Sequence, residues 1–356
     1  MHADLRDILT RLLDAPGPSG AETAVAAAWR ELAARFADRT WGDVNGNSFA
    51  EIGAGAGPTV MLAGHVDEIG LIVHHVDDEG FLWVQGVGGW DPQVLVGQRV
   101  EVLSEAGPVT GVVGRKAVHL IRKDDVDKAV KLKDLWVDIG ASGGDEARRR
   151  VQVGDVAVIR SDTVDLGNGR LAARSIDDRA GAVVVLEALR RAKEAGCSVH
   201  VVAAATVQEE IGYVGGGGAR TGAYGVRPDV GIVVDVTHAT DHPSLDRKEH
   251  GDVRIGAGPV LGRGAAINPV VYRKLREAAG EEGIEVQVQA LAAMTGTDAD
   301  ALRMSRAGVA TGLVSVPNRY MHSPNQIVAL DDVEGAAALI AAFLVRLDAG
   351  DAFLPL

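Results

Sequence analysis

The feature that most constrains the fold is an apolar run at residues 199–207 that ends in two adjacent carboxylates. This short run, rich in Val and Ala, is typical of a strand that is buried on both faces of a parallel sheet. Gln208, Glu209 and Glu210 follow it, and the glycine run at 215–218 cannot easily continue a strand. Open α/β sheets place their ligand crevices at the carboxyl ends of strands, so the carboxylates are expected at such an edge. The alternative is that the two carboxylates only begin a solvated loop. The residues at the other strand ends of the chain help to decide between these two interpretations.

The remainder of the chain alternates helices with strands over most of its length. The loop at 15–20 places Ser19 or Gly20 near the start of the second predicted helix. Apolar spacing predicts helices at 4–14, 21–38, 180–192, 269–280, 298–304 and 330–347. Strands are predicted at 43–50, 59–63, 199–207, 229–236, 253–255, 284–290 and 309–316. This order favours an α/β fold with a mostly parallel sheet covered by helices on both faces.

Residues 71–168 have a different texture from the flanking segments. Short alternating strands are separated by Gly-rich turns, and only 124–132 and 145–149 look helical. That pattern predicts an inserted small β-barrel that serves assembly or walls the site. The expected organisation is a first part of the catalytic α/β domain at 1–70, the barrel at 71–168, and the second part of the catalytic domain at 169–356.

Composition excludes several classes of function. The 356-residue chain has a formal net charge of −13, so the basic footprint of a nucleic-acid or anionic-membrane binder is absent. Cys197 is the only cysteine, which excludes an internal disulfide framework and a thiolate metal cluster. No window has the apolar length of a membrane span, and the charged N-terminus lacks the core of a signal peptide. A cytoplasmic location is expected.

Polar side chains cluster at strand ends or in the loops that follow strands. Because the carboxyl ends of parallel strands meet at one sheet edge, these clusters are expected to converge. They are His65 with Asp67, Asp177 with Asp178, Glu209 with Glu210, Asp235, and His322. Seven further histidines, at 74, 75, 119, 200, 238, 242 and 250, lack a comparable pattern and are interpreted as structural, with His238 the least certain.

Clustered acids repel one another unless a cation neutralises them. Two histidines and three carboxylates suit a pair of borderline divalent ions such as Zn²⁺, Co²⁺ or Mn²⁺. Such a pair can hold a bridging hydroxide and polarise a carbonyl, while a further carboxylate moves the proton. In His65-Val66-Asp67, the i, i+2 spacing would let Asp67 hydrogen-bond the imidazole and fix its tautomer. A helix N-cap is the plain alternative for at least one of Asp177 and Asp178.

With these residues assembled, the chain resembles the TET / glutamyl aminopeptidase family of dinuclear metallo-aminopeptidases, some of whose members are labelled cellulases. The resemblance covers essentially the whole length, and six motifs in order make it specific. They are Gly64-His65-Val66-Asp67-Glu68-Ile69-Gly70, Asp177-Asp178-Arg179-Ala180-Gly181, Gln208-Glu209-Glu210-Ile211-Gly212, Asp235-Val236-Thr237-His238-Ala239, Gly296-Thr297-Asp298-Ala299 and Arg319-Tyr320-Met321-His322-Ser323-Pro324.

The resemblance implies a role for each matched residue. Asp177 would bridge two metal ions, and the other ligands would be His65, Glu210, Asp235 and His322. Glu209 would be the general base and acid, and Asp67 would orient His65. The inserted β domain of the family goes with assembly into hollow dodecamers, so a homo-oligomer is expected. Gln326 departs from the family, which usually has Glu two residues after the His-Ser-Pro triplet; position 326 is not expected to be a ligand.

The leading hypothesis is an aminopeptidase that trims short peptides from their free N-terminus, by attack of the metal-bridging hydroxide. The second hypothesis keeps the site and makes the protein a metal-dependent deacylase or amidohydrolase of small N-acyl compounds. A third is a non-catalytic member that uses the barrel as an interaction module. That hypothesis predicts that metal ligands are missing, whereas all five are present in this sequence. A cellulase would need two carboxylates that flank a sugar acetal, and Glu209 and Glu210 are neighbours expected to diverge.

Overall fold

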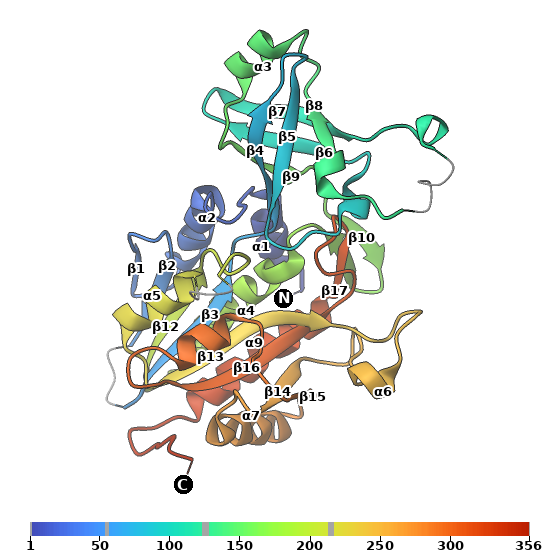
Figure 1. Cartoon of the computed structure of the whole chain (residues 1–356). Coiled ribbons are helices and arrows are strands. Elements are labelled where there is room, and N and C mark those ends of the chain that lie inside the picture. The colour runs from blue at the N-terminus through green and yellow to red at the C-terminus, as the bar shows by residue number, and fades with distance from the viewer. Residues whose placement is uncertain (1, 54–56, 123–127, 213–216, 356) are drawn as a thin grey trace.

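The computed structural model describes residues 2–53, 57–122, 128–212 and 217–355, without the side chains of residues 2 and 3. Its centre is an eight-stranded sheet (Figure 1). The strands run in the order β1 (Arg39–Gly42), β2 (Ser48–Ile52), β12 (His200–Thr206), β3 (Thr59–His65), β13 (Val230–His238), β16 (Ala310–Asn318), β14 (Val260–Gly264) and β15 (Gln287–Leu291). The four central strands, β12, β3, β13 and β16, are parallel to one another.

Helices cover both faces of this sheet, because alternate residues of its strands belong to two separate apolar cores. Leu62 and Ile232 belong to the larger core, whereas Met61 and Val233 belong to the smaller. The larger core is closed by α1 (His2–Asp14), α2 (Thr23–Ala33), α4 (Ile176–Glu194), α7 (Pro269–Glu282) and α9 (Leu330–Val345). The smaller core is closed by α5 (Gly217–Val226) and α8 (Asp298–Arg303). The predicted α/β class, with a mostly parallel sheet between helices, is confirmed.

The inserted barrel lies between β3 and α4 in the chain and forms the upper body in Figure 1. It is closed in the order β4 (Gly70–Val76), β5 (Phe81–Val87), β8 (Trp136–Asp138), β7 (Gly107–Gly114), β6 (Arg99–Ser104) and β9 (Val156–Ile159). All of its strand pairs are antiparallel, and its interior is a third apolar core. The predicted barrel is therefore confirmed, while the domain boundaries at 70/71 and 168/169 stay predictions.

Two helices were predicted within the insert. The one at 145–149 is α3 (Gly144–Arg150). For the one at 124–132, residues 124–127 lie outside the described part of the chain. The rest of that range contains no α-helix, only the start of a 3₁₀ turn, η4 (Leu132–Asp134). Two further 3₁₀ turns, η1 (Pro92–Leu95) and η2 (Val118–Leu120), lie in the same segment.

Several other boundaries differ from prediction for local reasons. The strand expected from residue 43 begins at Ser48, because the Asp43 carboxylate accepts the amide hydrogens of Asn45 and Asn47 and closes a turn. The second helix is shorter than expected and ends at Ala33. Residues 253–255 are not a strand. The sequence analysis did not predict α5, α6 (Arg247–His250), β14, or a small sheet of β10 (Val164–Gly167), β11 (Arg170–Ala173) and β17 (Gln326–Ala329).

One close backbone approach places β3 against α4. A Cβ atom on Gly64 would lie 2.6 Å from the carbonyl carbon of Gly181, so this contact needs glycine at position 64. The approach brings the end of β3 beside the first turn of α4, where His65 and Asp177 lie. Among the described residues, no helix has the length and apolar character needed to cross a bilayer.

Candidate metal centre

Four of the five predicted ligands lie in or after the central strands, towards their carboxyl ends, and the fifth lies at a helix start. His65 is the last residue of β3, and Glu210 follows β12 by four residues. Asp235 lies in β13, His322 follows β16, and Asp177 lies at the start of α4. The structure brings these side chains into two groups of three, each with donor atoms within 4.8 Å of one another. The groups are His65, Asp177 and Asp235, and then Asp177, Glu210 and His322.

The first group is buried. His65 is 2% exposed, and its Nε2 atom lies 3.1 Å from Asp177 Oδ1. On the other side of the ring, Nδ1 lies 3.2 Å from the carbonyl oxygen of Asp67 and 3.4 Å from that residue's Oδ1. A proton on Nδ1 would therefore be bound locally, which leaves Nε2 directed at Asp177 and Asp235. The expected contact between Asp67 and the His65 ring is present.

The second group includes a contact with the barrel. His322 Nε2 lies 3.4 Å from Asp177 Oδ2 and 3.2 Å from Glu210 Oε2. Its Nδ1 atom lies 2.8 Å from the carbonyl oxygen of Gly89, in the loop after β5. A Cβ atom at Gly89 would lie 3.2 Å from this ring, so glycine permits the approach. The barrel thus fixes the tautomer of His322 by accepting the Nδ1 hydrogen.

The adjacent acids Asp177 and Asp178 contact different groups. Asp178 points away from the rings, accepting the backbone hydrogens of His65 at 3.2 Å and Gly181 at 3.0 Å. The helix-cap alternative therefore describes Asp178, whereas Asp177 faces the imidazoles. The backbone N–H of Asp177 donates to the side-chain oxygen of Gln326 at 2.8 Å, so Gln326 supports Asp177.

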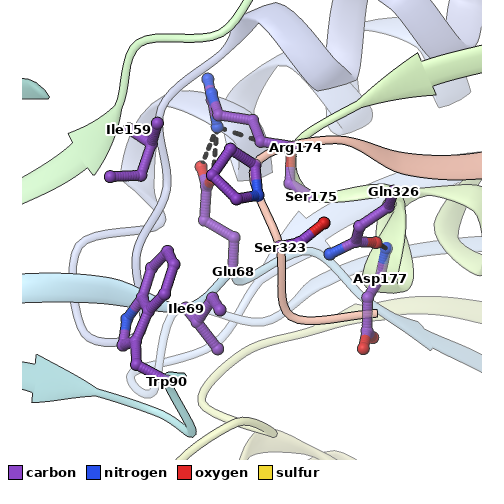
Figure 2. Close-up of a pocket in the computed structure, with 10 residues that line it drawn as sticks. Glu68, Ile69, Trp90, Ile159, Arg174, Ser175, Asp177, Ser323 and Gln326 are labelled. Carbon is purple, nitrogen blue, oxygen red and sulfur yellow. Dashed lines mark hydrogen bonds and ion pairs between the residues drawn. The ribbon is translucent and has the colours of Figure 1, made fainter. Parts of the chain in front are cut away.

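Figure 2 shows the surroundings of this support, where Asp177 and Gln326 lie side by side. The pocket drawn there also contains Glu68, which is ion-paired with Arg174, and it is closed on the barrel side by Trp90 and Ile159. Arg174 and the buried Arg179 both pair with Glu68, so their guanidinium groups are held by a carboxylate that belongs to neither ligand group.

Two buried acidic residues near the ligand cluster had little or no pattern in the sequence that pointed to the site. Asp298 is 3% exposed and accepts a hydrogen bond from Thr206 at 2.5 Å. It lies in a matched motif, but nothing in its pattern assigned it a role. Glu22 is 6% exposed and accepts the backbone hydrogen of Gln208 at 3.1 Å. Of the histidines interpreted as structural, His238 ends β13 but belongs to neither ligand group.

The electrostatics of the cluster show an excess of negative charge. Burial raises the pKa of Glu209 to about 10, and although His65 opposes this, the charges of Asp235 and Asp298 reinforce it. Burial and neighbouring acids likewise raise the pKa of Asp235 well above its usual range. Although burial favours a neutral ring, Asp177 and Glu210 raise the pKa of His322 to about 11. Burial would raise the pKa of Asp177, but contacts with the two histidines lower it.

Divalent cations fit this donor set on two grounds. Imidazole nitrogen and carboxylate oxygen are the ligands of Zn²⁺ and its neighbours, at about 2.0–2.2 Å from the ion. Donors that converge on one ion at that distance lie at most about 4.4 Å apart, close to the spread within each group. A cation would also relieve the repulsion that raises the carboxyl pKa values.

Comparison with known proteins finds one sequence family and several similar structures. The sequence profile described as M42 glutamyl aminopeptidase matches residues 46–339. The lysyl aminopeptidase of Pyrococcus furiosus is 34% identical over 347 residues, which are 96% of this chain and 97% of the relative. A TET aminopeptidase from the marine sediment archaeon Thaumarchaeota archaeon SCGC AB-539-E09 has 35% identity and a TM-score of 0.91, covering 98% of both chains.

The TET1 peptidase of Pyrococcus horikoshii, which can assemble into a tetrahedron or a large octahedral shell, is 31% identical with a TM-score of 0.84. That comparison covers 96% of this chain and 100% of the other. PhTET1-12s, at the same identity and TM-score, is a dodecamer and is covered over 99% of its length.

Proposed function

This chain belongs to the M42 glutamyl aminopeptidase family and is a metallo-aminopeptidase that releases N-terminal residues, and we propose that it works with two divalent cations that share Asp177. The observation that carries the proposal is that Asp177 contacts both imidazoles through different oxygen atoms. His65 and Asp235 would hold one ion, and Glu210 and His322 the other. Zn²⁺ or Co²⁺ is the expected metal, with Mn²⁺ as the alternative.

Such ions acidify water and polarise the scissile carbonyl when bound. The chain's own contribution is to place a free carboxylate beside them. Glu209 belongs to neither ligand group, and its Oε2 atom lies 4.0 Å from His65 Nε2. Its side chain is 17% exposed, so part of it is open to solvent beside the cluster. We assign Glu209 to take the proton of the attacking water and to deliver it to the leaving amine.

Two reactions are compatible with this arrangement, and substrates separate them. An aminopeptidase cleaves aminoacyl anilides, which carry a free α-amine, and leaves N-acetylated amino acids intact. A deacylase or amidohydrolase has the opposite preference. The metal-reconstituted protein is expected to cleave the anilides, and preferential hydrolysis of the N-acetyl compounds would replace the proposal by the second candidate.

The role of Glu209 has its own test. Glu209→Gln keeps the size of the side chain but removes the proton acceptor, so turnover should fall by about 10²- to 10⁴-fold. Metal content should remain that of the wild type, because Glu209 is not in a ligand group. Normal hydrolysis of anilides by this variant would show that another group moves the proton.

We also propose that the chain forms homo-oligomers, with a dodecamer as the expected state. The support is the inserted barrel together with the dodecameric PhTET1-12s. Light scattering of the purified protein should give twelve times the chain mass of 37.1 kDa, and a monomer would contradict it. The cytoplasmic location expected from the sequence stays a prediction.

A further inference from the structure

The loop between α1 and α2 lies against the segment that follows the metal-ligand strand β3. The N–H of Ser19 donates to the carbonyl of Glu68 at 3.2 Å, and the N–H of Glu68 donates to the carbonyl of Gly17 at 3.0 Å. These two bonds, with the bridge between Pro18 and Glu68, fix the loop beside Asp67. The sequence placed Ser19 near a helix start, but its hydroxyl donates to Asp67 Oδ2 at 2.7 Å instead of capping the helix.

Glu22 extends from the same loop to the turn that carries Glu209 and Glu210. Its Oε1 atom accepts the backbone hydrogens of Gly20 at 2.7 Å and Gln208 at 3.1 Å. The next two amides of the turn donate to Asp67, Glu209 N at 3.1 Å and Glu210 N at 3.2 Å. Three successive amide hydrogens are thus held by two buried carboxylates.

This arrangement holds the turn at a residue with an uncommon backbone conformation. Gln208 has φ +60°, a left-handed conformation that is unfavourable for residues other than glycine. Glu22 and Asp67 bind the amide hydrogens of residues 208–210. These bonds fix the backbone of the turn, and the backbone sets the directions in which the side chains of Glu209 and Glu210 project. Asp67 alone accounts for two of the three amides, and Glu22 for the third.

The ordinary explanation of Glu22 is an acidic residue at a helix start. Such residues interact with the helix terminus from the surface, whereas Glu22 is 6% exposed and no side-chain capping bond marks the start of α2. Within the described residues it has no ion pair with Lys, Arg or His to offset its burial. Burial, opposed by the hydrogen bond from Gly20 and reinforced by Asp67, raises the pKa of Glu22.

We propose that Glu22 is a positioning residue for catalysis: by binding the amide of Gln208, it sets the direction of Glu209 and Glu210 at the metal centre. The inference rests on the proposed function, since it gives those two carboxylates their roles. Loss of Glu22 should let the turn relax, which moves both the proton-transferring group and one predicted ligand. A displacement of about 1 Å at such a site costs about a hundredfold in rate.

The test compares Glu22→Ala, Glu22→Gln and a matched control, Asp332→Ala. Asp332 is also a buried carboxylate that accepts two backbone hydrogens, from Gly256 and Gly258, but it lies at the start of α9. For each protein, kcat and KM on an aminoacyl anilide, the thermal midpoint, and Zn²⁺ titration of the metal-free form are measured. If Glu22→Ala does not fold, Glu22→Asp replaces it, because the shorter carboxylate cannot reach Gln208.

Glu22→Ala is expected to lower kcat about ten- to hundredfold with KM nearly unchanged, and to weaken one of two Zn²⁺ binding steps. Glu22→Gln should restore both, because its amide oxygen can accept the same hydrogens. Asp332→Ala should lower the thermal midpoint without altering kcat or Zn²⁺ binding.

A wild-type kcat in Glu22→Ala, or a Glu22→Gln variant as impaired as Glu22→Ala, would overturn the positioning role. A wild-type protein that binds fewer than two Zn²⁺ ions would instead overturn the proposed function, so the two failures are distinguishable.

Discussion

Asp177 presents one carboxylate oxygen to each histidine of the site. Oδ1 lies 3.1 Å from His65 Nε2, and Oδ2 lies 3.4 Å from His322 Nε2. A carboxylate that binds one ion through both oxygens would direct them to the same side. The observed division between two rings supports the proposed bridging role of Asp177, and it is the basis of the two-cation proposal.

The protonation of the two rings predicts how metal binding depends on pH. In the metal-free protein the pKa of His322 is about 11 and that of His65 is well above its usual value, because carboxylates surround both rings although burial opposes the charge. The His322 ring is therefore doubly protonated at pH 7 and the pKa of His65 is shifted in the same direction, whereas a metal ligand must be neutral imidazole. Binding must release protons, so apparent affinity should rise as pH increases.

Calorimetric titration with Zn²⁺ between pH 6.5 and 8.5, in buffers of different ionisation enthalpy, measures this release. We expect about one to two protons per chain and a tenfold gain in affinity per pH unit for each proton. Affinity that does not change with pH would mean that the rings are already neutral, and the description of their surroundings would be wrong.

Residues of the cluster could be predicted from the sequence where they interrupt or follow an apolar strand. Glu209 and Asp235 stand out because polar side chains at the ends of buried runs need a partner. The choice of Asp177 over Asp178 came from the family resemblance, since neighbouring acids cannot be separated by spacing. Glu22 was not predictable, because its contact with Gln208 joins segments 186 residues apart.

At the scale of elements, the backbone contact between β3 and α4 aligns the site. Gly64→Ala would place a Cβ atom 2.6 Å from one backbone atom of Gly181 and 2.8 Å from the backbone nitrogen of Ala182. Backbone atoms cannot turn aside, so β3 or α4 must shift. We expect a loss of about 1–3 kcal/mol in the free energy of unfolding, together with weaker metal binding by His65.

Gly280→Ala is the matched control. Gly280 lies in α7 with nothing within 4 Å of a built Cβ atom, so alanine should leave stability unchanged or add about 0.5–1 kcal/mol. Denaturant unfolding of the two variants measures both effects. Equal stability of Gly64→Ala and wild type would show that the helix and strand can separate at no cost.

Elements with long apolar patterns were predicted well, and short ones were not. The strands β12 and β13 are continuous buried runs, which no other secondary structure of that length explains as well. The small sheet of β10, β11 and β17 has strands of four residues, and its partners β11 and β17 are separated by more than 150 residues. Its pairing is set by tertiary structure, so local pattern carries no signal for it.

At the scale of the whole molecule, the barrel contacts the candidate metal centre and is more than an appended body. The carbonyl of Gly89, in a loop of the barrel, accepts the Nδ1 hydrogen of His322 at 2.8 Å. The sequence predicted an inserted β module that serves assembly or walls the site. The contact with His322 could not be predicted, because it depends on how the barrel sits on the sheet (Figure 1).

The most direct test of the account is the divalent metal content per chain after reconstitution and dialysis, for the wild type beside Asp177→Asn and His322→Ala. The account predicts two ions in the wild type, one in His322→Ala, and weakened retention of both in Asp177→Asn, because only Asp177 belongs to both groups. A wild-type protein that retains one ion or none, or an Asp177→Asn variant that keeps both as firmly as the wild type, would contradict it.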